Sequence, residues 1–190
     1  LLRIEDPKPI EQVRLISFDY YQNMLPKTIS DEVVLLDIGE KSLELGGQWP
    51  WPRSQIAQLV SDLRSSNAGI IGLTVMFPES DRFGQDAILK SWLEGNGIVL
   101  SQTASSKGRM TVAPYVGTAV LGNGDPYNFA YEYAGIVTNI SEFEQSAAGV
   151  GMINAAPEVD GMVRRIPLIS QINKQIYPAM PMEMIRVMSD

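Results

Sequence analysis

Residues 54–77, SQIAQLVSDLRSSNAGIIGLTVMF, decide the fold class of this chain because they join a helix pattern directly to a strand pattern. In the first half, apolar residues recur at three- and four-residue spacing after Pro52, which predicts a helix over Ser54–Leu63. In the second half, Ala68–Phe77 is almost continuously apolar, which is typical of a strand covered on both faces of a parallel sheet.

The segments on either side repeat this alternation of strand and helix. Glu32–Ile38 (EVVLLDI) is a short apolar run that predicts a strand buried on both faces. Phe83–Leu93 predicts a helix, and Gly97–Ser101 (GIVLS) predicts a further strand. Because strands that alternate with helices form right-handed βαβ units, we expect an α/β fold with a mixed, mainly parallel sheet flanked by helices.

Both ends of the chain are predicted to be helical, with a hairpin before the C-terminal helix. Glu158–Gly161 contains Asp-Gly, which favours a tight turn, and Met162–Ser170 is expected to return as an antiparallel strand. The other predicted elements are an amphipathic helix over Pro9–Leu25 that docks one face, strands over Gly135–Ile140 and Val150–Ala155, irregular chain over Gly117–Asn128, and a helix over Pro181–Met188. We expect one domain over 1–190, with a helical part (1–30), an α/β core (31–175) and a last helix (178–190).

The composition is that of one globular domain, and it excludes several classes of function. The 190 residues are 45% hydrophobic, and 15 basic against 22 acidic residues leave a net charge of −7. This charge argues against binding to nucleic acid, which needs a positive field. The chain has no Cys and no His, so thiol nucleophiles, disulfides, structural zinc sites and Ser-His-Asp triads are excluded. We expect no cofactor.

Three carboxylates follow the predicted strands. Asp37 closes the first strand, and Glu79 and Asp81 follow the second. Because the carboxyl ends of parallel strands meet at one edge of a sheet, we expect these acids to gather there. They would suit a hard cation such as Mg²⁺ or Ca²⁺, or they would form structural ion pairs with Arg53 and Arg82.

The segment GQWPWPR, residues 47–53, places two Trp between Pro residues just ahead of a predicted helix. Pro restricts the backbone and Trp supplies a large rigid surface, so we expect a stiff lid over the sheet edge. The lid is either a hydrophobic plug for the helix or a pocket wall formed by Trp49 and Trp51, in which Arg53 clamps an anion.

Two blocks of the sequence resemble the extracytoplasmic sensory domain of the CHASE family, type two. The first block covers residues 33–63 and includes Asp37, Glu40 and the motif WPWPR of residues 49–53. The second block is PEVDGMVRRIPL, residues 157–168. The two blocks are separate in the sequence, so they support the resemblance independently.

The resemblance extends from about Phe18 to the C-terminus and also includes Gly69–Asp81. Within that segment, Thr74 stands where the family commonly has an Asp. This departure removes one carboxylate from the expected acidic cluster.

The resemblance implies a bacterial receptor module that lies outside the cytoplasmic membrane. Membrane helices beyond this sequence would anchor it in the inner membrane and lead to a cytoplasmic histidine kinase, nucleotide or diguanylate cyclase, or Ser/Thr kinase. We therefore predict a non-enzymatic periplasmic or extracellular sensor that acts as a homodimer and binds an unknown small molecule or ion. The expected ligand contacts are Asp37, Glu40, Trp49, Trp51, Arg53, Glu79 and Asp81.

Two alternatives remain open. The strand that ends in Asp37 resembles the start of the haloacid-dehalogenase phosphotransferases, which would make the chain a soluble metal-dependent phosphohydrolase. Gly39 stands where that family has its second Asp, so the general acid would be missing. In the second alternative, the domain binds no small molecule and is a structural spacer or a surface for another periplasmic protein.

Overall fold

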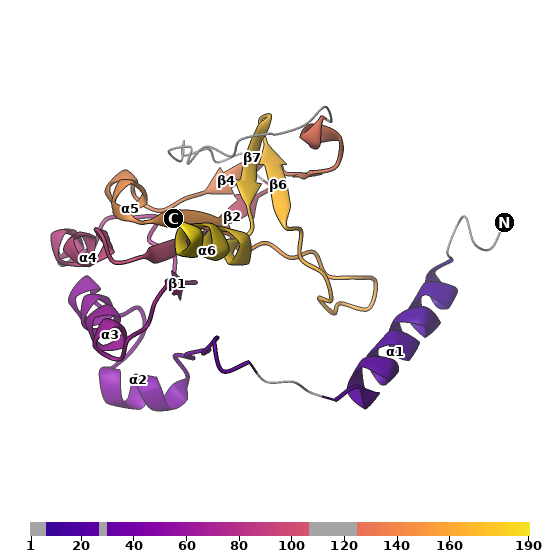
Figure 1. The fold of residues 1–190 in the computed structure, drawn as a ribbon, viewed down its shortest axis with the longest axis horizontal. Coiled ribbons are helices and arrows are strands. Elements are labelled where there is room, and N and C mark those ends of the chain that lie inside the picture. Colours follow the sequence, from indigo (N-terminus) through magenta and orange to yellow (C-terminus); the bar gives the residue numbers. More distant parts are fainter. Residues whose placement is uncertain (1–6, 27–29, 107–124) are drawn as a thin grey trace. The chain divides into compact units, whose positions relative to one another are not determined.

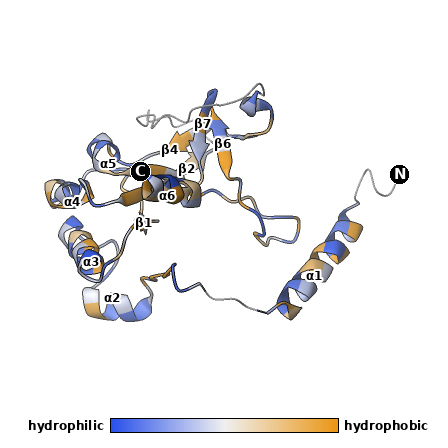
Figure 2. Ribbon diagram, viewed as in Figure 1, coloured by the Kyte–Doolittle hydropathy of each residue, from blue (hydrophilic) through white to orange (hydrophobic). Residues whose placement is uncertain are grey.

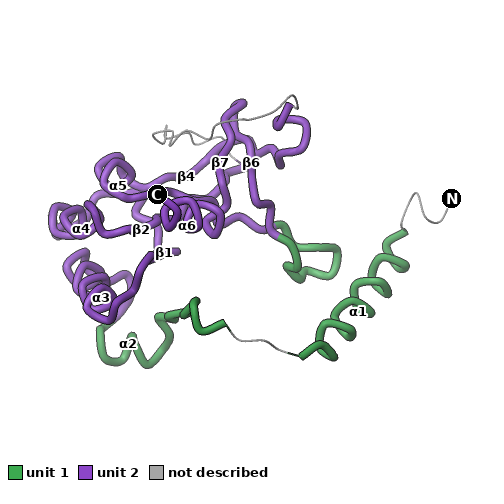
Figure 3. Tube along the Cα trace, in the orientation of Figure 1, with its two compact units in different colours: residues 1–47, 156–165 green, residues 48–155, 166–190 purple. Residues whose placement is uncertain are grey.

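The computed structural model describes residues 7–26, 30–106 and 125–190 (Figure 1). The chain divides into two compact units, which are residues 1–47 with 156–165, and residues 48–155 with 166–190 (Figure 3).

The first unit contains helix α1 (Lys8–Met24), which confirms the predicted N-terminal helix. Pro9 lies in its first turn, where the missing N–H is tolerated. Hydrophobic and hydrophilic residues alternate along the helix (Figure 2). Leu15 is buried, whereas Val13 and Ile16 are 65% and 66% exposed. Neither α1 nor any other helix of the described residues is long and apolar enough to cross a membrane.

The prediction of a buried strand over Glu32–Ile38 is wrong. The segment is not a strand, and its residues from Val33 to Leu35 are 77–92% exposed. A strand needs a neighbouring strand for its backbone hydrogen bonds, and within the described residues none pairs with this run. An apolar composition favours a strand but does not provide the neighbouring strand, so the sequence pattern alone was not enough to predict one here.

A short helix, α2 (Glu40–Gly46), follows this segment. Gly47 ends it with a φ of 87°, a left-handed conformation that glycine adopts without strain. The Gly47 N–H donates to the Leu43 carbonyl at 2.9 Å. The same unit holds the predicted turn at Glu158–Gly161, where the Gly161 N–H donates to the Glu158 carbonyl at 2.9 Å.

The second unit contains the main sheet, which is built around β2 (Ile98–Ser105). β1 (Ile71–Leu73) and β5 (Gly149–Met152) pair in parallel with the first half of β2, and β4 (Gly135–Val137) pairs antiparallel with its end. The mixed α/β class is therefore confirmed. The strand predicted over Ala68–Phe77 is much shorter than we expected, because only β1 is paired.

Three helices pack with the main sheet around the core. α3 (Arg53–Ser65) and α4 (Asp86–Leu93) confirm two predicted helices, and α5 (Ser141–Ser146) is additional. Buried side chains of these helices meet those of β1 and β2 in one cluster. The rings of Phe77 and Phe143 lie within it and meet edge to face, with their centroids 5.4 Å apart.

A second sheet of three strands contains the C-terminal hairpin. Its order is β3 (Tyr131–Glu132), β6 (Ile169–Ile172) and β7 (Gln175–Pro178), with β3 parallel and β7 antiparallel to β6. The hairpin is confirmed, but its predicted position is wrong. Asn173 and Lys174 form its turn with φ values of 51° and 59°, the backbone twist that tight hairpins require. The 3₁₀ helix η1 (Pro126–Asn128) precedes β3 and is the described end of the predicted irregular region.

The last helix, α6 (Met180–Ser189), confirms the prediction and packs closely on β5. A Cβ at Gly151 would overlap the backbone of Met180, so only glycine allows this approach. Arg186 donates from Nε and Nη2 to the two carboxylate oxygens of Glu183, at 3.0 and 2.8 Å. The Glu183 side chain, which is buried against the sheet, is therefore paired with the charged Arg186.

Candidate functional site

Arg53, at the start of α3, is held on several sides by the fold. Its Nε donates to Asp86 Oδ1 at 3.1 Å, and its Nη2 donates to the Glu79 carbonyl at 2.9 Å. The guanidinium lies 4.5 Å from the centroid of the Phe77 ring, within the range of a cation–π contact. This ion pair joins Arg53 to Asp86, which the sequence analysis did not single out, and not to the carboxylates of Glu79 or Asp81.

In the loop between Phe77 and α4, backbone N–H groups donate hydrogen bonds to the nearby carboxylates of Asp81 and Asp86. Asp81 Oδ2 accepts from the Gln85 N–H at 3.0 Å, and Asp86 Oδ2 accepts from the Asp81 N–H at 2.8 Å. These bonds place negative charge at the start of α4, where it is favourable. Glu79 itself is exposed. Among the described residues, no group of three or more acidic side chains is arranged to hold a metal ion.

The two Trp side chains differ in their surroundings. Their ring centroids lie 5.9 Å apart with an angle of 55° between the planes. Trp51 packs against the core cluster of the main sheet, as the plug hypothesis requires, whereas Trp49 is 40% exposed. Trp49 is therefore the member of the pair that presents a surface to solvent.

Asp37 and Glu40 lie in the first unit, and the other five expected ligand residues lie in the second. Asp37 is exposed and follows the unpaired apolar run, and Glu40 is exposed in the first turn of α2. In the second unit, Thr74 is exposed directly after β1. The structure therefore describes Asp37 and Glu40 separately from Arg53 and its neighbours.

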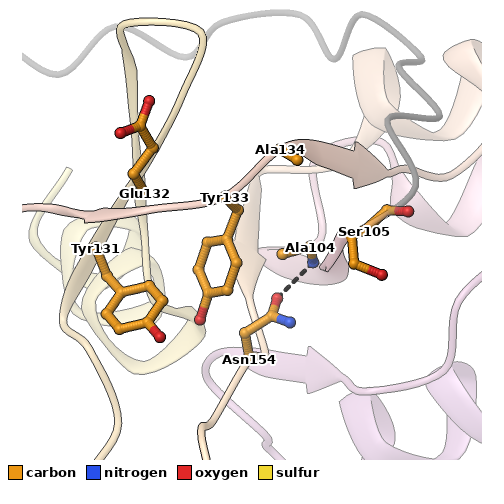
Figure 4. A pocket seen from close by; sticks show the side chains of 8 residues that line it. Ala104, Ser105, Tyr131, Glu132, Tyr133, Ala134 and Asn154 are labelled. Carbon is orange, nitrogen blue, oxygen red and sulfur yellow. Dashed lines mark hydrogen bonds between the residues drawn. The ribbon is translucent and has the colours of Figure 1, made fainter.

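A groove that the sequence analysis missed opens where the two sheets of the second unit meet (Figure 4). Its volume is about 490 Å³, within the range of small-molecule sites. It is lined by Ala104, Ser105, Ser106, Tyr131, Glu132, Tyr133, Ala134 and Asn154. The motif Tyr131-Glu132-Tyr133 was the available signal, because residues two apart in extended chain lie on one face.

The two tyrosine rings stand side by side in this groove. Their centroids are 4.9 Å apart and the planes are tilted by 42°. Partial burial, and to a lesser degree the neighbouring Tyr131, raises the pKa of the Tyr133 hydroxyl above its usual value. Tyr133 is thus a protonated hydrogen-bond donor throughout the physiological pH range.

A buried polar network lies beside the core. Asn139 Oδ1 accepts from the Phe77 N–H at 2.8 Å, and Asn139 Nδ2 donates to the Ser101 carbonyl and to Glu144 Oε1, both at 3.0 Å. Glu144 is 4% exposed, and burial raises the pKa of its carboxyl despite these hydrogen bonds. Its Oε2 has no hydrogen-bond partner within the described part of the chain.

An ion cluster in the first unit explains part of the second resembling block. Arg164 donates to both oxygens of Asp19 on α1, at 2.8 and 2.6 Å, and to Asp160 and Glu158 in the turn. Hydrogen bonds from Arg164 lower the pKa of Asp160 to about 2 and also lower the pKa of Asp19. This arginine therefore joins the turn of residues 156–165 to α1.

These features define a mixed α/β domain in which α6 packs tightly on the main sheet and a tyrosine-lined groove opens between two sheets. The model of the CHASE2 domain matches residues 1–190, the whole chain, so the chain belongs to the CHASE2 family. Members of this family are extracellular sensory domains of receptors, which assigns the chain to sensing and not to catalysis. Searches of the curated proteins and of the solved structures found no match to it.

Proposed function

We propose that this chain is the ligand-sensing part of a transmembrane receptor whose cytoplasmic part is a histidine kinase, a nucleotide or diguanylate cyclase, or a Ser/Thr kinase. The observation that carries the proposal is the match of the CHASE2 domain to all 190 residues. The same match argues against the alternative of a soluble phosphohydrolase that uses Asp37. In this proposal the domain lies outside the inner membrane, and segments beyond this sequence anchor it.

Signalling in this proposal is a shift between two conformations that differ in the positions of the terminal helices α1 and α6. A ligand shifts such an equilibrium only by its difference in affinity for the two states. The close contact of Gly151 with Met180 supports a role for α6, because a movement of β5 cannot occur there without displacing the helix backbone. The Arg164 to Asp19 pair supports an equivalent role for α1.

The receptor acts as a homodimer in this proposal, with α1 in the interface. Val13, Ile16 and Tyr20 are all more than 60% exposed on this helix. Exposed apolar side chains that gather on one element are typical of protein interaction surfaces.

The location of the domain can be tested with a single introduced cysteine, because the chain has none of its own. We would place it at Gln145, an exposed residue of α5, in the full-length receptor with any cysteine outside this chain replaced by serine, and treat intact cells with a membrane-impermeant maleimide. We expect labelling without permeabilisation. A cysteine in the cytoplasmic part serves as the control and should be labelled only after permeabilisation. Labelling of both positions only in permeabilised cells would contradict the proposal.

The dimer can be tested in the same receptor. A cysteine at Val13 should form a disulfide-linked dimer under mild oxidation in membranes, and the matched cysteine at Gln145 should not. Absence of a linked dimer at Val13 and at each of its neighbours Gln12 and Arg14 would argue against an α1 interface.

A further inference from the structure

We propose that the groove lined by Tyr131, Tyr133 and Asn154 is the ligand site of this domain, and that it binds a neutral sugar in its pyranose form. The assignment of the groove as a binding site depends only on its geometry. The further step, that the bound sugar is the signal of a receptor, rests on the proposed function.

The aromatic part of the groove suits the flat face of a sugar ring. Tyr131 and Tyr133 project from the same side of the backbone, with ring centroids 4.9 Å apart (Figure 4). Tyr131 is 53% exposed, so its ring surface is available without any movement of the core. One face of a pyranose carries C–H bonds that are weakly polarised, and these stack favourably on an aromatic ring, whose face is electron-rich.

The polar part of the groove suits the hydroxyl groups at the rim of the same sugar. The hydroxyls of Tyr131 and Tyr133 point toward the side of the groove where Asn154 lies (Figure 4). Asn154 Oδ1 accepts a hydrogen bond from the Ala104 N–H at 2.6 Å. This bond fixes the orientation of the amide and does not use its Nδ2 donor. In the described residues, neither this Nδ2 nor the two tyrosine hydroxyls has a hydrogen-bond partner. A ligand with several hydroxyls satisfies all three groups.

The charges around the groove favour a neutral ligand. Among the described residues that line it none is basic, so an anion would find no counter-charge from this part of the lining. Glu132 is the charged residue in the described part of the lining, and its carboxylate projects from the opposite side of the backbone to the two tyrosine rings (Figure 4). An ammonium group stacked on the rings would therefore lie far from its carboxylate.

The position of the groove connects it to α6. The Tyr133 N–H donates to the Gln171 carbonyl of β6 at 2.9 Å, whereas the Ile153 N–H, next to Asn154, donates to the Gln102 carbonyl of β2 at 3.0 Å. A ligand that touches Tyr133 and Asn154 therefore bridges the two sheets. The second sheet continues through β7 directly into α6, which packs on β5 of the main sheet, so a ligand that bridges the two sheets acts on both elements that hold this helix.

Saturation-transfer NMR on the complete 190-residue chain tests the assignment, with methyl β-glucopyranoside and methyl β-galactopyranoside as probes. We expect transfer to the C–H protons of at least one pyranoside in the wild-type chain and its loss in Tyr131→Ala. In Asn154→Asp, which retains the oxygen that binds Ala104 but loses the amide donor, affinity should fall roughly three- to tenfold, as expected for one hydrogen bond. The matched control is Tyr127→Ala, a partly exposed tyrosine outside the groove, which should retain wild-type transfer.

Tetramethylammonium and inorganic phosphate are the competing probes. Transfer to tetramethylammonium without transfer to either pyranoside, or binding of phosphate alone, would overturn the assignment. Equal transfer in the wild-type, Tyr131→Ala and Tyr127→Ala chains would also overturn it. The labelling of Gln145→Cys in intact cells is independent of these titrations, so a failure of the sugar site is distinguishable from a failure of the receptor proposal.

Discussion

Arg164 and Asp19 form a bidentate ion pair in which Nε lies 2.8 Å from Oδ1 and Nη2 lies 2.6 Å from Oδ2. The two residues are 145 positions apart in the sequence. A guanidinium that binds both oxygens of a carboxylate restricts orientation as well as distance. The pair therefore holds α1 in a defined orientation to the turn of residues 156–165.

Replacing Arg164 by Lys should loosen α1, because an ammonium group cannot reproduce the two parallel hydrogen bonds. We expect faster hydrogen–deuterium exchange of the amides around Asp19. Arg165→Lys is the matched control, because Arg165 is 75% exposed and its nearest contact, to Glu158, is 3.7 Å. Exchange at the same rate in both variants would show that the Arg164 pair does not hold the helix.

The same cluster should make stability depend on pH in the acid range. Arg164 holds the pKa of Asp160 at about 2, below its ordinary value of 3.8. A carboxylate with a lowered pKa stabilises the folded state above its unfolded pKa, and this contribution is lost as the pH falls from about 3.8 towards 2. The difference in unfolding free energy between wild type and Asp160→Asn should be constant near neutral pH and should shrink in that window. A difference independent of pH would contradict the assignment.

Glu144 should have the opposite pH dependence. Burial raises the pKa of its carboxyl, so the folded state favours the protonated form, and stability should fall as the pH rises from 4.5 through the raised value. Glu144→Gln keeps an oxygen for Asn139 and removes the charge, so its thermal midpoint should exceed that of wild type at pH 7. Glu142→Gln, on the exposed side of the same helix, should leave the midpoint unchanged. A lower midpoint for Glu144→Gln at pH 7 would show that the charged form is required.

Gly151→Ala should destabilise the second unit, because the added Cβ would overlap the Met180 backbone. Overpacking of this kind costs about 1–3 kcal/mol. Gly69→Ala is the matched control, since a Cβ at Gly69 meets no atom within 4 Å. Urea unfolding would measure both variants, and an equal free energy for the two would show that α6 can shift away from β5 without loss.

Arg53→Gln should destabilise the junction of α3 and α4 by about 2 kcal/mol, because it removes hydrogen bonds from a charged group that is 13% exposed. The partly buried carboxylate of Asp86 would also lose its counter-charge. Arg82→Gln is the control, since Arg82 is exposed beside Phe83. If chemical denaturation gave equal stabilities for the two variants, the contacts of Arg53 would be unimportant to the stability of the fold.

The helices were predictable because a helix forms its backbone hydrogen bonds within its own segment of the chain. Periodic apolar residues and flanking prolines located α1, α3 and α6 to within one or two residues, since every hydrogen bond within them joins near neighbours. The apolar run at Glu32–Ile38 has an equally clear pattern and forms no strand, because strand pairing depends on residues elsewhere in the chain.

For the expected ligand residues too, local features were predictable from the sequence and contacts between distant residues were not. The motif around Trp51 left a plug and a pocket wall open as alternatives, and the structure packs Trp51 against the core cluster. That Arg53 would bind Asp86 was not predictable, because the two residues are 33 positions apart and meet only when α3 and α4 pack. The Tyr131 groove was missed for a similar reason, since Ala104 comes from β2 and Asn154 from the chain that follows β5.

The sequence by itself determined the α/β class, membership of the CHASE2 family, and the absence of histidine and cysteine chemistry. Composition, local periodicity and family motifs are all readable along the chain. Only the tertiary structure decided that Arg164 binds Asp19, that Glu144 is buried beside Asn139, and that two tyrosines line an open groove. Each of these depends on distances between residues far apart in sequence or on the exclusion of water, and both arise only when the elements pack.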